Sequence, residues 1–289
     1  MSKIIALVDG SAYSTSTCDY AAWIAKREGH SVEVLHIITR KIDADSNLSG
    51  NIGLGARSKL MDQLADLDAQ QAKLANERGR AILEDAEARI RADGVENVTT
   101  RLRHGDLLEE LLEAETTASL VVIGKRGENA DFASKHLGSN LERVVRASAI
   151  PVLVASRAFT EPKSFLLAFD GGKSAVKAVD HLATAKTFTG LEARIISAGN
   201  DSANATRAIE GAAATLKNAG FEVSHEIVEG TPTEVFATRI HVAGQDANPD
   251  GADMLVMGAY GHSRIRNLII GSTTTEMIRT CQVPLLLVR

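Results

Sequence analysis

Residues 255–261 read Leu-Val-Met-Gly-Ala-Tyr-Gly, and residues 120–127 read Leu-Val-Val-Ile-Gly-Lys-Arg-Gly. Each stretch is an apolar run of strand length that ends at two closely spaced glycines. Each is followed by Gly-Ser, an amphipathic stretch, and an apolar run that starts at a proline, Pro151 or Pro284. An apolar run ending in aspartate, Asp9 or Asp170, opens each half. Because the matching blocks keep one order, the chain is an internal duplication.

The offsets between the matching blocks show where the halves differ. The offset is 161 at the aspartates (170 minus 9), 134 at the first glycines (258 minus 124) and 133 at the prolines (284 minus 151). The first half therefore carries 27 extra residues in its middle (161 minus 134) and one more in its glycine loop. At roughly 150 residues per domain, a chain of this length predicts two domains. We assign them to residues 1–156 and 157–289, with a short proline-containing linker at 156–163.

Each half alternates short apolar runs with amphipathic stretches, a pattern typical of strand–helix units around a parallel sheet. The apolar runs lack clean alternation, as expected for strands that are covered on both faces. The sequence thus predicts an α/β protein with two doubly wound, five-stranded parallel-sheet domains in tandem. We predict strands at residues 4–8, 32–38, 98–103, 120–123 and 152–155, and at 165–169, 193–198, 222–228, 254–257 and 285–288.

The extra residues of the first half begin with a polar stretch. Residues 39–55 are rich in Asn, Asp and Gly and predict a mobile loop. Leucines then recur at helical spacing in a stretch that reaches about Asp93, namely Leu60, Leu64, Leu67 and Leu74. Two interpretations are open: a long helix that lays this stripe on the sheet, which we favour, and a helix that protrudes to meet a partner.

The bulk composition excludes some classes of partner. Hydrophobic residues make up 44% of the chain and charged residues 24%, and the net charge is −5. Nucleic acid and anionic membrane are therefore not expected as partners. The apolar run at residues 4–8 is too short for a signal peptide or a spanning helix. The two cysteines, Cys18 and Cys281, have no partner at metal-ligand or redox spacing, so we expect buried thiols in a cytoplasmic protein.

The glycines after the fourth predicted strand of the second half form the strongest candidate site. Gly258 and Gly261 follow that strand, nine residues then lead to Gly271, and Gly271 opens a helix. Ligands of doubly wound sheets bind beyond the carboxyl ends of the strands, and a glycine lets backbone approach a ligand. A helix N-terminus offers unpaired N–H groups to an anion. Tight turns with a serine cap and no ligand remain the alternative.

Two familiar phosphate-binding motifs are missing from the sequence. No GxxxxGK[ST] occurs, so a Walker-type loop is excluded, and no GxGxxG follows a first strand, so a dinucleotide fold is not expected.

The pattern Gly-x2-Gly-x9-Gly-Ser, with an aspartate ending the first strand, resembles the ATP-binding branch of the universal stress protein family over essentially the whole chain, once per half. The resemblance implies an adenine nucleotide alpha hydrolase-like fold that binds ATP at the crevice. Whether Mg²⁺ accompanies the ATP stays open. The resemblance also implies that domains pair through their last strands. It implies an adenosine border of Ala168, Asp170 and Ala198, and ribose and phosphate contacts from Gly258, Gly261, His262, Gly271, Ser272, Thr273 and Thr274. For Asp170 a turn carboxylate, and for His262 a solvated loop histidine, are the alternatives.

The first half departs from this pattern. Ten residues rather than nine separate Gly127 from Gly138, and Glu128 and Asp131 stand where phosphates would pass. Two carboxylates repel a polyphosphate, which Lys125 and Arg126 offset only in part. We expect weaker nucleotide binding or another ligand here. The candidate residues are Asp9, Gly124, Gly127, Gly138 and Ser139.

The sequence favours a nucleotide-binding regulatory protein of the stress response over an enzyme. No carboxylate pair, Ser–His–Asp order or metal cluster is present, so hydrolysis of ATP is expected to be slow at most and no metal site is assigned. Asp106, after His104 and Gly105, is expected to cap a helix. The alternatives are an ATP-dependent adenylating or pyrophosphatase-type enzyme, faintly suggested by residues 170–174, and an empty interaction scaffold. We expect the two domains to pair within the chain; a protein partner and a dimer of whole chains stay open.

Overall fold

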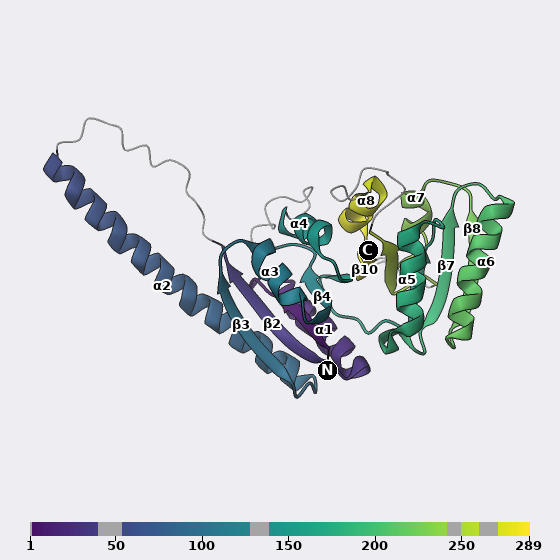
Figure 1. Ribbon diagram of the computed structural model, residues 1–289, viewed down its shortest axis with the longest axis horizontal. Coiled ribbons are helices and arrows are strands. Elements are labelled where there is room, and N and C mark those ends of the chain that lie inside the picture. Colours follow the sequence, from purple (N-terminus) through teal and green to yellow (C-terminus); the bar gives the residue numbers. More distant parts are fainter. Residues whose placement is uncertain (1, 40–53, 128–138, 242–249, 260–270) are drawn as a thin grey trace.

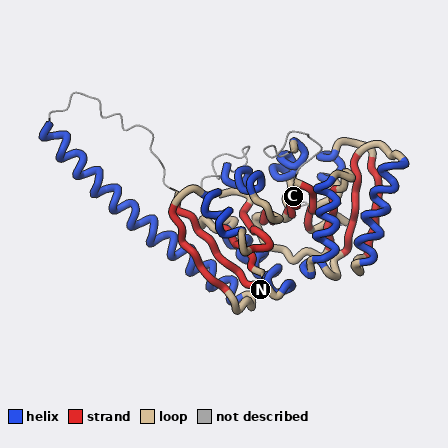
Figure 2. Tube along the Cα trace, viewed as in Figure 1, coloured by secondary structure: helices blue, strands red, loops and turns tan. Residues whose placement is uncertain are grey.

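The computed structural model describes residues 2–39, 54–127, 139–241, 250–259 and 271–289, with only the backbone described at 54–60 and 139. Ten strands form one sheet flanked by helices (Figures 1 and 2). The first half contains β1 (Lys3–Leu7), α1 (Ser14–Glu28), β2 (Ser31–Ile38), α2 (Leu54–Ala92), β3 (Val98–His104), α3 (Leu107–Glu115), β4 (Ala118–Gly124), α4 (Ser139–Ala147) and β5 (Val152–Ala155). The second contains β6 (Ser164–Ala168), α5 (Lys173–Thr184), the 3₁₀ turn η2 (Lys186–Phe188), β7 (Glu192–Ala198), α6 (Ala203–Asn218), β8 (Glu222–Val228), α7 (Pro232–Ala237), β9 (Met254–Gly258), α8 (Ser272–Thr280) and β10 (Leu285–Val288).

All ten predicted strands are present. The strand order is β3-β2-β1-β4-β5-β10-β9-β6-β7-β8, so each half is a parallel five-stranded sheet with its first strand in the middle. The halves join where β5 and β10 pair antiparallel, with Leu153 opposite Leu286. This pairing agrees with the expectation that the last strands join within the chain, and it removes two exposed edges from the sheet.

Helices cover both faces of the sheet because side chains alternate along each strand. Ile4, Ala6 and Val8 pack in the core beneath α1, α2, α5 and α6. Ile5 and Leu7 point the other way, into the core beneath α3, α4, α7 and α8. Both cores run across the junction of the halves, so one packed layer on each side spans the whole sheet.

Helix α2 both packs on the sheet and protrudes from it (Figure 1). Its last turns bury Leu83, Ala86 and Ile90 against the first core. Its first half extends away from the sheet, and there Leu67 and Leu74 are 52% and 67% exposed. The favoured prediction that the leucines form a stripe on the sheet is therefore wrong: the buried stripe lies further along the helix, where strands β2 and β3 are within reach. The predicted loop at 39–55 falls almost entirely outside the described residues.

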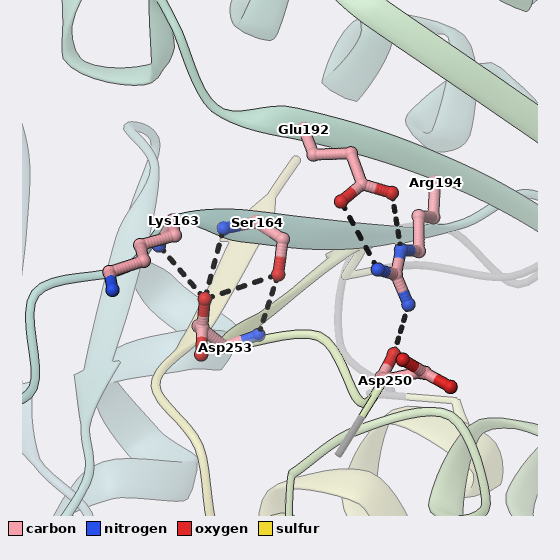
Figure 3. Close-up of polar contacts among 6 residues, drawn as sticks. All are labelled: Lys163, Ser164, Glu192, Arg194, Asp250 and Asp253. Carbon is pink, nitrogen blue, oxygen red and sulfur yellow. Dashed lines mark hydrogen bonds and ion pairs between the residues drawn. The ribbon is translucent and has the colours of Figure 1, made fainter. Parts of the chain in front are cut away.

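The linker and the amino ends of β6, β7 and β9 are fixed by polar contacts. Asp253 accepts hydrogen bonds from the backbone N–H groups of Lys163 (2.9 Å) and Ser164 (3.0 Å) and from the Ser164 hydroxyl (3.1 Å), as Figure 3 shows. The Arg194 guanidinium donates hydrogen bonds to both carboxylate oxygens of Glu192. It also donates one to the backbone carbonyl of Asp250. The end of the linker is thereby tied to the residue that precedes β9.

Candidate functional site

The switch in strand order of the second half lies between β6 and β9. The chain runs from β6 outward to β7, whereas β9 is followed by β10 on its other side. Ala168, the last residue of β6, pairs with Met257, so the segments that leave β6 and β9 part at this point. Asp170 and Gly258 therefore follow the two strands at whose carboxyl ends the sequence predicts the ligand crevice.

Asp170 shapes a tight turn directly after β6. Its Oδ1 accepts the Gly172 N–H at 2.8 Å, and Gly171 between them has φ +71°. The structure therefore shows the turn contact that was the alternative role for Asp170. A left-handed φ favours glycine, so the Asp-Gly dipeptide is the sequence signal for this turn.

The same turn recurs in the first half. Asp9 Oδ1 accepts the Ser11 N–H at 3.0 Å and the Ser14 hydroxyl at 3.2 Å, and Gly10 has φ +77°. The duplication therefore preserves the turn in both crevices.

Gly258 is a glycine because of helix packing rather than backbone conformation. A Cβ built on it would lie 2.5 Å from Ser174 Oγ and 2.9 Å from the Ala175 amide nitrogen, both at the start of α5. Gly124 is in the same position, with a Cβ 2.6 Å from Tyr13 Cβ. Neither glycine has a positive φ. Packing against the following helix is thus a reason for glycine at both positions that the local pattern did not reveal, and close approach of a ligand there stays a prediction.

Helix α8 begins beside this crevice with its first amides uncapped. Gly271 is its N-cap residue and has no side chain to accept their hydrogen bonds. Its carbonyl accepts the Thr275 N–H at 3.0 Å, so the amides of Ser272, Thr273 and Thr274 precede the first N-terminal intrahelical bond. Ser272 is exposed, Thr273 half-buried and Thr274 buried at 3% exposure. Anion binding by these amides stays a prediction, and the burial of Thr274 places its side chain toward the core.

Of the remaining predicted residues of the second half, two are described by the structure and two are not. Ala168 is 8% exposed at the end of β6, and Ala198, at the end of the neighbouring β7, is half-buried. Both thus lie at the carboxyl edge, as predicted. Gly261 and His262 lie outside the described residues.

The first half brings Asp9 and Gly127 together. A Cβ on Gly127 would lie 2.8 Å from Asp9 Oδ2. The ammonium of Lys125 donates to the backbone carbonyl of Cys281, where α8 ends. Burial lowers the pKa of Lys125. This lysine therefore joins the two halves, and a cation is favoured at a helix C-terminus. Gly138 lies outside the described residues, as do Glu128 and Asp131, and Ser139 begins α4.

Three other predictions are settled by side-chain contacts. Asp106 caps α3, as expected: its Oδ1 accepts the Leu108 N–H at 2.8 Å, and Arg143 pairs with its Oδ2 at 2.6 Å. Both cysteines are free and buried, and burial raises the pKa of Cys18 to about 12 and of Cys281 to about 11. Such thiols are weak nucleophiles.

Two other kinds of feature are absent from the described ranges. No group of three or more His, Cys, Asp or Glu side chains there is arranged to hold a metal ion. Among the helices of those ranges, none is long and apolar enough to cross a membrane.

A model of the universal stress protein family matches residues 1–156 and again residues 162–289. The chain belongs to the universal stress protein family. It is 35% identical over 294 residues to the universal stress protein Slr1230 of Synechocystis sp., with 100% of both chains covered.

Solved structures agree on the fold. A universal stress protein from Archaeoglobus fulgidus covers 99% of the chain at a TM-score of 0.73 and 22% identity, and 98% of that chain is covered. A shorter universal stress protein, matching 54% of this chain over 98% of its own length (TM-score 0.36, 19% identity), was solved in complex with cAMP.

Proposed function

We propose that the second half binds ATP in the crevice between β6 and β9, and that the chain acts as a nucleotide-dependent regulatory protein of the stress response. The observation that carries the proposal is the uncapped start of α8. Among the described residues no side chain caps this helix start, so the amides of Ser272 and Thr273 are proposed to donate to an external acceptor. A phosphate supplies that acceptor and also the negative charge that a helix N-terminus favours.

The rest of the crevice fits the other parts of the nucleotide. Asp170 is held by its own turn at the end of β6, where its carboxylate borders the proposed adenosine site. Ala168 and Ala198 are small, so they leave room over the ends of their strands. Gly258, Gly261 and His262 complete the proposed set, and Mg²⁺ as a companion of the phosphates belongs to the same hypothesis.

The first half is proposed to bind nucleotide more weakly. Its Lys125 donates to the Cys281 carbonyl in the other half, and its loop carries Glu128 and Asp131, whose charges repel a polyphosphate. Gly127 is also in close contact with Asp9. One strong and one weak site per chain is the expected stoichiometry.

The substitution Gly271→Asp tests the second site. Gly271 has φ −59° and ψ 147°, which an aspartate adopts without strain and which suits an N-cap. The new carboxylate would cap α8 with its own oxygen and repel phosphate. We expect the variant to keep its fold by circular dichroism and to lose at least tenfold in ATP affinity by isothermal titration calorimetry.

Asn218→Asp is the matched control. It adds the same single charge at an exposed position on the opposite edge of the sheet, where α6 ends. Its ATP affinity should equal that of the wild type. Unchanged affinity in Gly271→Asp would refute the assignment. No heat with ATP in the wild type would favour the empty scaffold, and release of AMP or pyrophosphate would favour the adenylating enzyme.

A further inference from the structure

Helices α4 and α8, which follow the Gly-Ser of their halves, both end at the junction of the halves. Helix α8 ends at Thr280, and Cys281 is its C-cap residue, shortly before β10. Helix α4 ends at Ala147, shortly before β5. Because β5 and β10 pair antiparallel, the start of each strand lies beside the end of the other. The end of each helix therefore lies close to the carboxyl edge of the other half.

Each of these helix ends accepts hydrogen bonds from a cation of the other half. The Lys125 ammonium donates to the backbone carbonyl of Cys281 at the end of α8. The Arg289 guanidinium donates to the backbone carbonyls of Ala147 (3.4 Å) and Ser148 (3.1 Å) at the end of α4. The last carbonyls of a helix have no partner within it and carry the negative end of its dipole, so a cation is favoured there. The two contacts are reciprocal, which makes capping by the other half a feature of the junction.

Arg279 and Lys125 both lie near the end of α8, in different surroundings. Arg279, in the last turn of α8, pairs with Glu276 at 3.3 Å and is about half exposed, so a carboxylate and water balance its charge. Lys125 is half-buried, and burial lowers its pKa. A partly buried charge is screened less than an exposed one. Lys125 is therefore the cation whose field acts along α8.

We infer that Lys125, a residue of the first half, strengthens the binding of ATP by the second half through α8. The inference rests on the proposed function, which places a phosphate at the start of α8. This helix has nine residues and is about 13 Å long, so the ammonium and the phosphate lie at the two ends of one short helix. At about 15 Å and an effective dielectric constant of about 20–40, two opposite unit charges attract by an amount that corresponds to about a two- to sixfold change in affinity.

The affinity of the second half thereby depends on the first half. Lys125 directly follows Gly124, the glycine that ends β4, so the cation at the end of α8 comes from the glycine loop of the first half. The antiparallel pairing of β5 and β10 brings this loop to α8. The joined sheet thus contributes to ligand binding as well as removing two strand edges.

The substitution Lys125→Met removes the charge and keeps the length of the side chain. ATP is titrated into the full chain by calorimetry at low ionic strength, and the affinity of the stronger site is compared. We expect the variant to keep its fold by circular dichroism and to bind ATP about threefold more weakly than the wild type. Lys125→Arg keeps the charge and should bind like the wild type. Equal affinities of the wild type and Lys125→Met would overturn the inference and leave the ATP site in place, whereas no ATP binding by the wild type would refute the proposed function itself.

Lys217→Met is the matched control, because it removes the same charge from the end of another helix. Lys217 is exposed in the last turn of α6, a helix of sixteen residues that follows β7 rather than the glycine loop. Its charge is exposed to water and therefore screened, so its ATP affinity should equal that of the wild type. A loss as large as that of Lys125→Met would show that the net charge of the protein weakens binding, and would overturn the inference.

Adenosine separates an effect of charge from a distortion of the site. It has no phosphate, so its affinity, measured by competition with ATP, should be the same in Lys125→Met and in the wild type. An equal loss for adenosine and ATP would show that the substitution distorts the crevice, and would overturn the inference. If Lys125→Met does not fold, Lys125→Gln takes its place, since glutamine keeps an N–H donor without the charge. The same weaker binding of ATP and unchanged binding of adenosine are expected.

Discussion

The substitution Gly258→Ala tests whether this glycine serves packing. The added Cβ would lie 2.5 Å from Ser174 Oγ, 2.7 Å from Ser174 Cβ and 2.9 Å from the Ala175 amide nitrogen. Carbon contacts are optimal at about 3.5–4.0 Å, so the methyl group overlaps the first turn of α5 by about 1 Å. Rotation of the serine relieves one contact only, because the other two involve the Cβ and the backbone of α5.

The change in the free energy of unfolding caused by Gly258→Ala is the sum of two opposing effects. Overpacking of a core contact costs about 1–3 kcal/mol. Alanine restricts the unfolded chain more than glycine does, and this stabilises the folded state by about 0.4–1 kcal/mol. We expect a net loss of about 1–2 kcal/mol without nucleotide, or about 2–8 °C in the midpoint of thermal unfolding for a chain of this size.

Gly211→Ala is the control with the opposite sign. Gly211 lies inside α6, and a Cβ there meets nothing within 4 Å. Alanine should raise the stability by about 0.5–1 kcal/mol because it is the better helix former. Both variants are compared with the wild type by thermal and urea unfolding, followed by circular dichroism. If Gly258→Ala unfolded at or above the wild-type midpoint in the absence of ATP, the packing argument would be wrong.

Three further predictions concern α2, α3 and the thiols. Leu83→Ala should lower the free energy of unfolding, measured in urea, by about 2–5 kcal/mol because Leu83 is buried. Leu74→Ala should lower it by at most about 0.5 kcal/mol because Leu74 is exposed. Equal losses would contradict the protrusion of the first half of α2. Asp106→Ala should lower stability by about 0.5–2 kcal/mol at pH 7. Because Arg143 lowers the folded pKa of Asp106 from 3.8, this loss should fade as pH falls below that value; a pH-independent loss would contradict the pairing. Cys18 and Cys281 should resist iodoacetamide at pH 8 until urea unfolds the chain, as mass spectrometry would show.

Much of the fold follows from local patterns in the sequence. Apolar runs mark the inner strands, because strands buried on both faces need apolar side chains throughout, whereas the edge strands β3 and β8 carry polar residues at many positions. The recurrence of Asp-Gly and of the glycine pairs predicts two like domains. Asp106 is identifiable as a cap because its position between a strand and a helix requires one. The right-handed crossover of parallel strands then restricts the topology, so the order of the strands along the chain is enough to locate the crevice.

The tertiary structure decided what depends on contacts between distant segments. The leucines of α2 have helical spacing in both halves of the helix, yet only the later residues reach β2 and β3, and periodicity does not tell which part meets the sheet. The local pattern around Gly258 does not show that Ser174 packs against it. The sequence gives Lys125 only a role within its own loop, and its contact with the Cys281 carbonyl of the other half is visible only in the structure. The capping of α4 and α8 by cations of the other half exists only because β5 and β10 pair antiparallel, a result of packing that no local pattern encodes.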